Sequence, residues 1–328
     1  MELTNVFVVF TSAHVFHAQN IIRTYNMSDY VFVCTNRSLA KELDDQKQVI
    51  VLGGIYPFDL IALLRCKALF RRSITEVRLF VPHFLNVASQ ALYSFFKARG
   101  ILRETCILPD GNLLFNAYSV TKTSLGNILR KVKSVLLLSN YDLIEGDICS
   151  IGKGDIHVYS YIENTRYSED PRFFERPINM PIADGKRSSG LLILGHFNQK
   201  VLDNVSLCHS ISNLLDENAV IYYKPHPRIN LGNDLFYKIL KKRINSISLI
   251  ANKASVEKIL NKYKDLDTVF AVGSSSLINV KLMYPSLEVH CCALKEYFGS
   301  FFDQKLKDNL DRLKISELPY KIDQNTDI

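Results

Sequence analysis

The sequence lacks an apolar run long enough to cross a membrane. A spanning helix needs about 18 or more consecutive residues without charge. The most apolar candidate, residues 56–73, is interrupted by Asp59, Arg65 and Lys67. The opening MELTNVFVVF includes Glu2 and no basic residue, so it predicts a strand and not a signal peptide.

The seven cysteines form no CxxC pair and no regular spacing, which excludes the usual zinc and thioredoxin-like patterns. Most lie inside apolar runs, as Cys34 does in YVFVCTN and Cys106 does in ETCILPD. Such cysteines are typical of small core residues in a reducing compartment. We therefore expect a cytoplasmic protein.

Several catalytic signatures are absent as well. The chain has no GxxxxGK[ST], no HExxH, no GxSxG and no GxGxxG after a strand. No pair of carboxylates has metal-ligand spacing, because the acidic groups at 43–45 and 145–147 are poorly placed for one. We expect neither a metal nor a bound cofactor.

What is present is the composition of a globular protein with an excess of positive charge. The 328 residues suffice for two domains, and 47% are hydrophobic and 22% charged. The net charge of +7 indicates an anionic partner, which could be nucleic acid, a nucleotide-phosphate substrate or a membrane surface. The basic groups at 71–72, 130–133 and 241–243 are typical of solvated helix faces, and the alternative is a peripheral membrane contact.

Apolar strand-like runs alternate with helix-like segments in both halves of the chain. Runs typical of strands occur at 5–10, 29–36, 49–53, 76–82, 104–111, 191–197, 219–227, 246–251, 268–276 and 287–292. Strand and helix in alternation with short connections predict parallel sheets covered on both faces. We therefore expect an α/β protein with two Rossmann-like domains that face a central cleft.

The alternation fails over residues 150–188, which are polar and contain three prolines in the stretch that begins at Ser160. We predict a first domain at 1–165, a linker at 166–189, a second domain at 190–300, and a C-terminal helix and tail at 301–328. In such sheets ligands bind at the carboxyl ends of the strands, so we expect the binding and catalytic residues in the loops at these ends.

The first such loop is Lys224-Pro225-His226-Pro227-Arg228, which ends an apolar run. Two prolines fix the backbone on both sides of the histidine, so that the imidazole has a defined direction. A positioned histidine beside cations is suited to binding or protonating a phosphate oxygen. The simpler alternative is a rigid turn with an exposed histidine.

A second loop, Gly273-Ser274-Ser275-Ser276, joins a strand to a helix. Hydroxyl groups and backbone N–H groups at a helix N-terminus form an anion site, whereas a simple cap would need one serine. A third loop begins at Gly195, where glycine permits either close approach of a ligand or close packing of helix and strand.

A fourth loop, Pro109-Asp110-Gly111-Asn112, ends the strand-like run of the first half that contains ETCIL. Pro-Asp-Gly favours an ordinary type I turn. At the carboxyl end of an interior parallel strand, the Asp110 carboxylate could instead act as a general base.

Three of these motifs in this order resemble the short motifs of bacterial sialyltransferases and polysialyltransferases: Asp110-Gly111, His226-Pro227 and Ser274-Ser275-Ser276. The segment TSAHVFHAQNII at 11–22 is also similar to the first loop of the lipooligosaccharide sialyltransferase group. The resemblance implies a GT-B fold, with the donor bound by the second domain and the acceptor by the first.

The resemblance further implies an inverting, metal-independent transfer from CMP-sialic acid to a glycan hydroxyl in capsule, O-antigen or lipooligosaccharide synthesis. His226 would help the CMP phosphate to leave, with Lys224 beside it, and Ser274–Ser276 would hold the nucleotide. The partners are then a nucleotide sugar and a glycan acceptor, and the acceptor, the linkage and the oligomeric state stay open.

The acidic motif departs from the family pattern, which usually has two acidic residues before the glycine. Pro109 replaces the first of them. If the base occupies the second position, Asp110 serves. If it occupies the first, then His14, His17 or His83 must be considered.

Two other interpretations compete with this one. CDP-glycerol glycerophosphotransferases and Kdo transferases also place a His-Pro and a Ser-Ser pair in the donor domain, so they would share His226 and Ser274–Ser276. A basic nucleic-acid-binding protein would need aromatic residues interleaved with Lys and Arg. The Tyr and Phe residues here lie mostly in apolar runs, so we expect no nucleic-acid partner.

Overall fold

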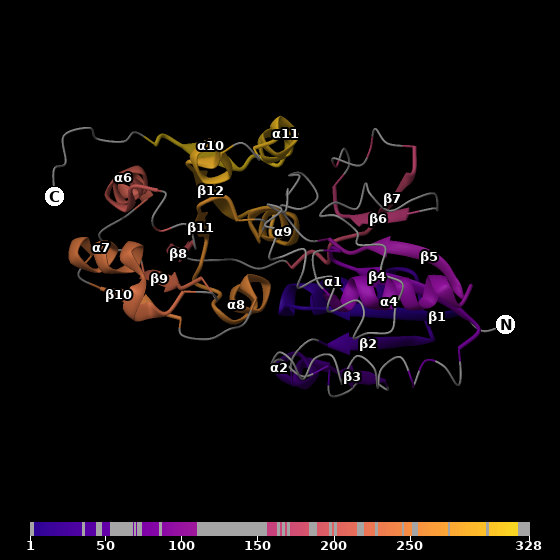
Figure 1. Cartoon of the computed structure of the whole chain (residues 1–328). Coiled ribbons are helices and arrows are strands. Elements are labelled where there is room, and N and C mark those ends of the chain that lie inside the picture. The colour runs from indigo at the N-terminus through magenta and orange to yellow at the C-terminus, as the bar shows by residue number, and fades with distance from the viewer. Residues whose placement is uncertain are drawn as a thin grey trace, which may run out of the picture. The chain divides into compact units, whose positions relative to one another are not determined.

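The chain folds into two units, residues 1–179 and 180–328, in a computed structural model (Figure 1). Each unit is built on one parallel sheet. The described residues are 3–34, 37–43, 48–52, 68, 70, 74–84, 87–109, 156–162, 165, 168, 171–183, 189–196, 199, 202–214, 220–226, 229–244, 246–250, 255–274, 276–299 and 302–320.

The first unit contains a seven-stranded parallel sheet in the order β3-β2-β1-β4-β5-β6-β7. Its strands are β1 (Leu3–Val9), β2 (Tyr30–Cys34), β3 (Val49–Val51), β4 (Glu76–Val81), β5 (Leu102–Ile107), β6 (Ile156–Ser160) and β7 (Phe173–Pro177). The described helices are α1 (Ser12–Thr24), α2 (Arg37–Ala40), the 3-10 turn Lys41–Leu43 and α4 (Val87–Ala98).

The second unit contains a six-stranded parallel sheet in the order β10-β9-β8-β11-β12-β13. Its strands are β8 (Gly190–Leu194), β9 (Val220–Lys224), β10 (Ile247–Leu249), β11 (Thr268–Ala271), β12 (Glu288–Cys292) and β13 (Ser316–Leu318). Its helices are α6 (Asn204–Ser210), α7 (Leu235–Arg243), α8 (Val256–Lys262), α9 (Ser276–Met283), α10 (Leu294–Phe298) and α11 (Gln304–Arg312), with 3-10 turns at Ser212–Leu214 and Leu231–Asn233.

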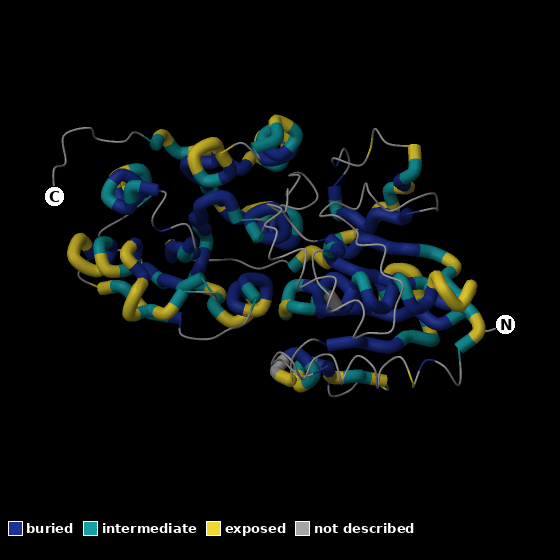
Figure 2. The backbone as a smooth tube through the Cα atoms, viewed as in Figure 1, coloured by how far each residue is buried: buried dark blue, intermediate teal, exposed yellow. Residues whose placement is uncertain are grey.

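Both sheets are buried on both faces, as the apolar runs predict. The central strands are dark in Figure 2, and the helices expose only their outer sides. In β1 the interior residues Val6, Phe7, Val8 and Val9 are fully buried. The predicted α/β class with two Rossmann-like parallel sheets is thus confirmed.

Two strands of the first sheet come from a segment that was predicted to be irregular. β6 pairs with β5, and β7 pairs with β6 over the register from Ile156↔Phe173 to Ser160↔Pro177. The predicted linker at 166–189 therefore includes a sheet strand, and the first unit extends to Asn179. Likewise β13 pairs with β12, so the second sheet extends beyond residue 300.

The order of strands defines a switch point in each sheet. In the second unit the chain builds outward from β8 to β10 and then restarts beside β8 with β11. In the first unit the same reversal separates β1 from β4. In open parallel sheets the crevice outside the carboxyl ends at this point is the usual ligand site. The loops after β8, β9 and β11 are therefore those to examine for chemistry.

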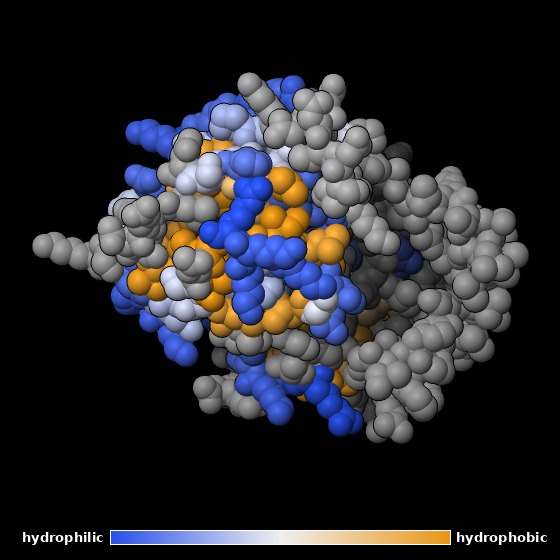
Figure 3. All heavy atoms as spheres, turned by 90° about the vertical axis from the view of Figure 1, so that its left-hand side faces the viewer, coloured by the Kyte–Doolittle hydropathy of each residue, from blue (hydrophilic) through white to orange (hydrophobic). Residues whose placement is uncertain are grey.

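The predicted basic group at the end of α7 lies on the protein surface. Lys241, Lys242 and Arg243 are exposed in the last turn of the helix, where cations are favourable beside the helix dipole. Figure 3, turned toward the side where α6 and α7 lie in Figure 1, shows hydrophilic side chains crossing apolar ones. This exposure agrees with a solvated helix face, and the alternative of a peripheral membrane contact stays a prediction.

The helices of the described part do not include one that is both long and apolar enough to cross a bilayer. The five cysteines that the structure describes are buried and unpaired, in agreement with the prediction for them: Cys34, Cys106, Cys208, Cys291 and Cys292.

Candidate functional site

The three polar loops of the second unit lie at the carboxyl ends of neighbouring strands. Gly195 follows β8, His226 lies two residues after β9, and Gly273 lies two residues after β11. β8 pairs with both β9 and β11, with Leu194 opposite Lys224 on one side and opposite Ala271 on the other. The structure therefore brings the predicted donor-side loops together at one edge of one sheet.

The glycine at the end of β8 is required by the protein's own packing. A Cβ atom on Gly195 would lie 2.5 Å from the Tyr223 hydroxyl and 3.0 Å from the backbone nitrogen of His226. The Gly195 N–H donates to the Lys224 carbonyl at 2.8 Å. Of the two interpretations of this glycine, close packing within the protein accounts for it, and the β8 and β9 loops are in direct contact.

The turn after β11 has the tight geometry that its glycine predicts. Gly273 has a φ of +54°, and a Cβ there would lie 2.6 Å from the Tyr297 ring on α10. The Ser274 hydroxyl oxygen accepts from the Ser276 N–H at 3.3 Å, so Ser274 acts as a cap at the start of α9. Ser275 and Pro227 lie outside the described residues.

Lys224, one of the cations predicted beside His226, is buried. Its exposed fraction is 7%, and the Glu257 carboxylate of α8 is the charge that interacts with it. Burial lowers the pKa of the Lys224 ammonium, and the negative charge of Glu257 opposes this shift. Glu257 is also buried, and its Oε1 accepts from Asn279 Nδ2 at 3.2 Å. Lys224, Glu257 and Asn279 thus connect the end of β9 with α8 and α9.

A buried polar network lies on the other face of β9. The Tyr223 hydroxyl donates to Asp234 Oδ2 at 2.7 Å, and Gln199 Nε2 donates to Asp234 Oδ1 at 3.0 Å. Gln199 Nε2 also donates to the His196 carbonyl at 2.9 Å, and Gln199 Oε1 accepts from the Phe236 N–H at 3.0 Å. These side chains are at most 7% exposed.

His196 extends this network at the end of β8. Its Nε2 lies 3.1 Å from Asn204 Oδ1, an acceptor, so we assign the proton to Nε2. Nδ1 is buried and has no hydrogen-bond partner in the described part of the chain. Burial lowers the pKa of the imidazole, although Asn204 and the charge of Asp234 act in the opposite direction. The sequence patterns did not indicate this network, because its hydrogen-bonded partners are up to 37 residues apart in the chain.

The alternative bases of the first unit lie near the switch point of their own sheet. His14 is 4% exposed, and its Nδ1 accepts from the Phe10 N–H at 3.3 Å. The Phe10 ring contacts the imidazoles of His14 and His83, with centroids 5.7 and 5.2 Å away. His17 Nδ1 lies 2.9 Å from the Tyr161 hydroxyl and is 2% exposed. The predicted Asp110, Gly111 and Asn112 lie outside the described residues, while Pro109 is buried.

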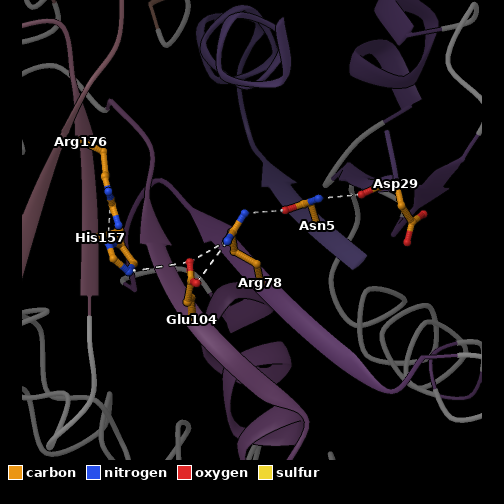
Figure 4. A network of polar contacts seen from close by, with 6 residues as sticks. All are labelled: Asn5, Asp29, Arg78, Glu104, His157 and Arg176. Carbon is orange, nitrogen blue, oxygen red and sulfur yellow. Dashed lines mark hydrogen bonds and ion pairs between the residues drawn. The ribbon is translucent and has the colours of Figure 1, made fainter. Parts of the chain in front are cut away.

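A separate polar network crosses the first sheet (Figure 4). Arg78 Nε and Nη2 donate to the two carboxylate oxygens of Glu104 at 2.6 and 3.1 Å. His157 Nε2 lies 3.7 Å from Glu104 Oε2, and Arg176 Nε donates to His157 Nδ1 at 3.1 Å. Asn5 completes the row, since its Oδ1 accepts from Arg78 Nη1 at 3.4 Å. These residues connect five strands and do not belong to the strand-end loops.

Among the described residues, no group of three or more histidine, cysteine or acidic side chains is arranged to hold a metal ion.

Residues 158–293 match the family model of the alpha-2,8-polysialyltransferases. The match covers less than half of the chain and includes the ends of β8, β9 and β11. No curated protein matches the sequence.

Solved structures resemble nearly the whole chain at low sequence identity. An α/β-galactoside α-2,3-sialyltransferase from Photobacterium phosphoreum has a TM-score of 0.56 at 10% identity, over 97% of this chain and 98% of that one. A 2,6-sialyltransferase from a Photobacterium species, in a ternary complex with CMP and lactose, has a TM-score of 0.52 at 10% identity, over 95% and 76%. A UDP-GlcNAc 2-epimerase from Methanocaldococcus jannaschii has a TM-score of 0.52 at 13% identity, over 95% and 92%.

At these identities the structural likeness shows the fold, and the same fold serves both transferases and epimerases. The family match lies over the polar loops of the second unit and is to transferases, not epimerases. The chain has the GT-B fold, and its residues 158–293 are similar to the alpha-2,8-polysialyltransferases.

Proposed function

We propose that this protein transfers sialic acid from CMP-sialic acid to a glycan hydroxyl, with inversion and without a metal ion, in the synthesis of a bacterial surface polysaccharide. The observation that carries the proposal is that the loop of His226 and the turn of Gly273 and Ser274 follow β9 and β11, the two strands that flank β8, inside the segment that matches the polysialyltransferases. The solved 2,6-sialyltransferase of the same fold supports CMP as the nucleotide, since it holds CMP.

The proposed chemistry depends on stabilising negative charge on the departing CMP. Pro225 precedes His226 and restricts the backbone, and β8 packs against the loop through Gly195, so the imidazole is held at the strand end. His226 would donate to or protonate a phosphate oxygen, while the N–H groups at the start of α9 would bind the same phosphate. Lys224 would contribute positive charge from its buried position at the end of β9.

The acceptor hydroxyl would be deprotonated by a base on the opposite face of the sugar, which gives inversion. Asp110 is our candidate, with His14 and His83 as the alternatives from the first unit. We propose the second unit as the donor side and the first unit as the acceptor side. Contact with the inner face of the cytoplasmic membrane is part of the same proposal, because the net charge of +7 would favour an anionic lipid surface.

The test is to incubate the purified protein with CMP-sialic acid, CDP-glycerol and UDP-GlcNAc in parallel, with and without EDTA. We expect slow hydrolysis of CMP-sialic acid alone, thermal stabilisation by CMP, and no effect of EDTA. Turnover of CDP-glycerol would establish the alternative glycerophosphotransferase. Indifference to every CMP compound would reject the proposal. Product analysis with a panel of galactosides would then identify the acceptor and the linkage.

A further inference from the structure

The histidine loop of the second unit is closed at its base by one buried hydrogen bond. Tyr223 lies just before the loop, in β9, and Asp234 caps α7 just after it. The Tyr223 hydroxyl donates to Asp234 Oδ2 at 2.7 Å, and both residues are 0% exposed. The ten residues 224–233 between them include His226, so this bond fixes the distance between the two ends of the loop.

Both oxygens of the Asp234 carboxylate accept hydrogen bonds at this junction. Oδ1 accepts from the Tyr237 N–H and from Gln199 Nε2, each at 3.0 Å, while Oδ2 accepts from Tyr223. Burial and the neighbouring charge of Asp234 raise the pKa of the Tyr223 phenol, so it remains a donor at neutral pH. A buried carboxylate that loses one of its donors has no solvent to replace it.

Gln199 joins the β8 loop to this closed loop. Its Nε2 donates to both Asp234 Oδ1 and the His196 carbonyl, and its Oε1 accepts from the Phe236 N–H in the first turn of α7. One amide therefore holds the residue after Gly195 and the start of α7 together. A Cβ atom at position 195 would lie 2.5 Å from the Tyr223 hydroxyl. Because glycine has none, the β8 loop can pack closely against Tyr223.

We infer that Tyr223, Asp234 and Gln199 form a clamp that sets the position of His226 against the β8 loop, and that they are positioning residues for the reaction. The inference rests on the proposed function for its catalytic consequence, since none of the three is assigned a contact with the donor. The clamp acts on the backbone that carries His226 and on Gly195. A displacement of about 1 Å in such a backbone can reduce catalysis by about 100-fold.

The strand offers a matched control one residue away. Tyr222 lies on the opposite face of β9, and its hydroxyl donates to Asp265 Oδ2 at 2.9 Å. Tyr223→Phe and Tyr222→Phe each remove one hydroxyl that is bonded to an aspartate, but only the first bond belongs to the clamp. Both variants retain the aromatic ring and both should fold.

Hydrogen exchange and donor kinetics of the two variants test the inference. We expect Tyr223→Phe to speed amide exchange across residues 225–233 and to lower kcat/KM for CMP-sialic acid about tenfold, because the loop is less well positioned. We expect Tyr222→Phe to match the wild type in both measurements. Equal exchange and equal kinetics in the two variants would overturn the clamp, and faster exchange without a kinetic change would reduce it to a structural feature.

A double variant supplies a second criterion. Gly195→Ala alone places a methyl group against the Tyr223 hydroxyl, whereas in Tyr223→Phe that oxygen is gone. The loss of kcat/KM in the double variant Gly195→Ala/Tyr223→Phe should therefore be smaller than the product of the losses in the two single variants. Strict additivity of the two effects would contradict the clamp. If the wild type ignores CMP compounds, the proposed function fails. The clamp is then decided by exchange alone, with equal rates in Tyr223→Phe and Tyr222→Phe overturning it.

Discussion

At the scale of single residues, His226 has the most direct predicted effect. His226→Ala should lower turnover of CMP-sialic acid by about 100-fold or more, because general acid catalysis by one side chain contributes about that much. The thermal midpoint should change little, since His226 lies in a loop two residues after β9 and is partly exposed. Turnover and the thermal midpoint are measured together.

The control for this variant is His209→Ala. His209 is an exposed histidine of α6 in the same unit, where its Nε2 lies 3.3 Å from an Arg243 nitrogen. Equal turnover by the two alanine variants would remove His226 from the mechanism and leave only its place in the loop.

The residues at strand ends were predictable, but their partners were not. His226 and Gly273 stand out in sequence because prolines, serines and glycines interrupt apolar runs at the carboxyl ends of parallel strands, which share one edge. Glu257 and Asp234 look like ordinary helix-start carboxylates. Only the fold places Glu257 by Lys224, 33 residues earlier in the chain, and Asp234 on the Tyr223 hydroxyl.

At the scale of elements, we expect an alanine in the turn between β11 and α9 to cost more unfolding free energy than an alanine at an uncrowded turn. Gly273→Ala must adopt a φ of +54° and must also displace the Tyr297 ring. Gly100, after α4, has a φ of +66° with nothing within 4 Å of the added Cβ. We expect Gly100→Ala to cost about 1 kcal/mol of unfolding free energy from the backbone alone. Gly273→Ala should cost about 2–4 kcal/mol.

Urea unfolding of the two glycine variants measures this difference. Because both substitutions add the same methyl group at a positive φ, the excess for Gly273 reports its contact with α10. If the two variants lose equal stability, Tyr297 moves aside at no cost, and the turn after β11 is less tightly packed than its geometry indicates.

The polar network across the first sheet predicts that the free energy of unfolding falls in acid. Burial raises the pKa of Glu104, but the hydrogen bond and charge of Arg78, with His157 and Arg176, outweigh burial and lower it. A lowered carboxyl pKa gives stability that is complete above the ordinary value of about 4.3 and is lost as pH falls below it. Glu104→Gln should therefore cost about 1–3 kcal/mol at pH 7 and progressively less below about pH 4.3.

Unfolding free energies at pH 7, 4.5 and 3.5 test this expectation. The control is Glu76→Gln, which replaces a carboxylate at the first position of the neighbouring β4, outside the row. A cost for Glu104→Gln that stays constant with pH would mean that the carboxylate stabilises the sheet by its shape and not by its charge.

Patterns of apolar residues predict the buried strands but not the edge strand β7. Long apolar runs such as that of β1 are buried on both faces and were predicted within a few residues. β7 was missed because it is an edge strand in the sheet order, with the mixed sequence FFERP and three exposed residues, including Phe174 at 46%. Such a strand has no periodic apolar face, and it is specified by pairing with β6 and not by its own composition.

At the scale of the whole molecule, the division between units follows pairing and not polarity. The chain changes units between Asn179 and Met180, because β7 completes the first sheet before the polar stretch ends. The polysialyltransferase match at 158–293 begins in β6 of the first unit and ends just after β12 of the second. It therefore includes two strands of the first sheet together with the three polar loops after β8, β9 and β11.

The stability of the molecule should fall in mild acid because burial, complete or partial, lowers the pKa of two histidines of the second unit. His290 lies in the middle of β12, and neither ring nitrogen has a hydrogen-bond partner in the described part of the chain. Its Nε2 is 3.8 Å from Glu288 Oε2, which is within ion-pair range but too far for a hydrogen bond. Burial lowers the pKa of His290, the Glu288 carboxylate raises it, and Lys281 lowers it further.

Since the folded-state pKa of His290 lies below the ordinary value of about 6.5, the unfolded chain binds more protons as pH falls through that value, and stability decreases. His290→Val cannot be protonated and keeps a β-branched residue in the strand. Its loss of thermal midpoint between pH 7.5 and 5.5 should be smaller than that of the wild type by about 1–2 °C. Part of the decrease in thermal midpoint should remain in His290→Val, because burial also lowers the pKa of His196. His209→Val, at an exposed position, should follow the wild type, and a His290→Val variant with the full wild-type decrease would show that this buried imidazole does not govern the acid response.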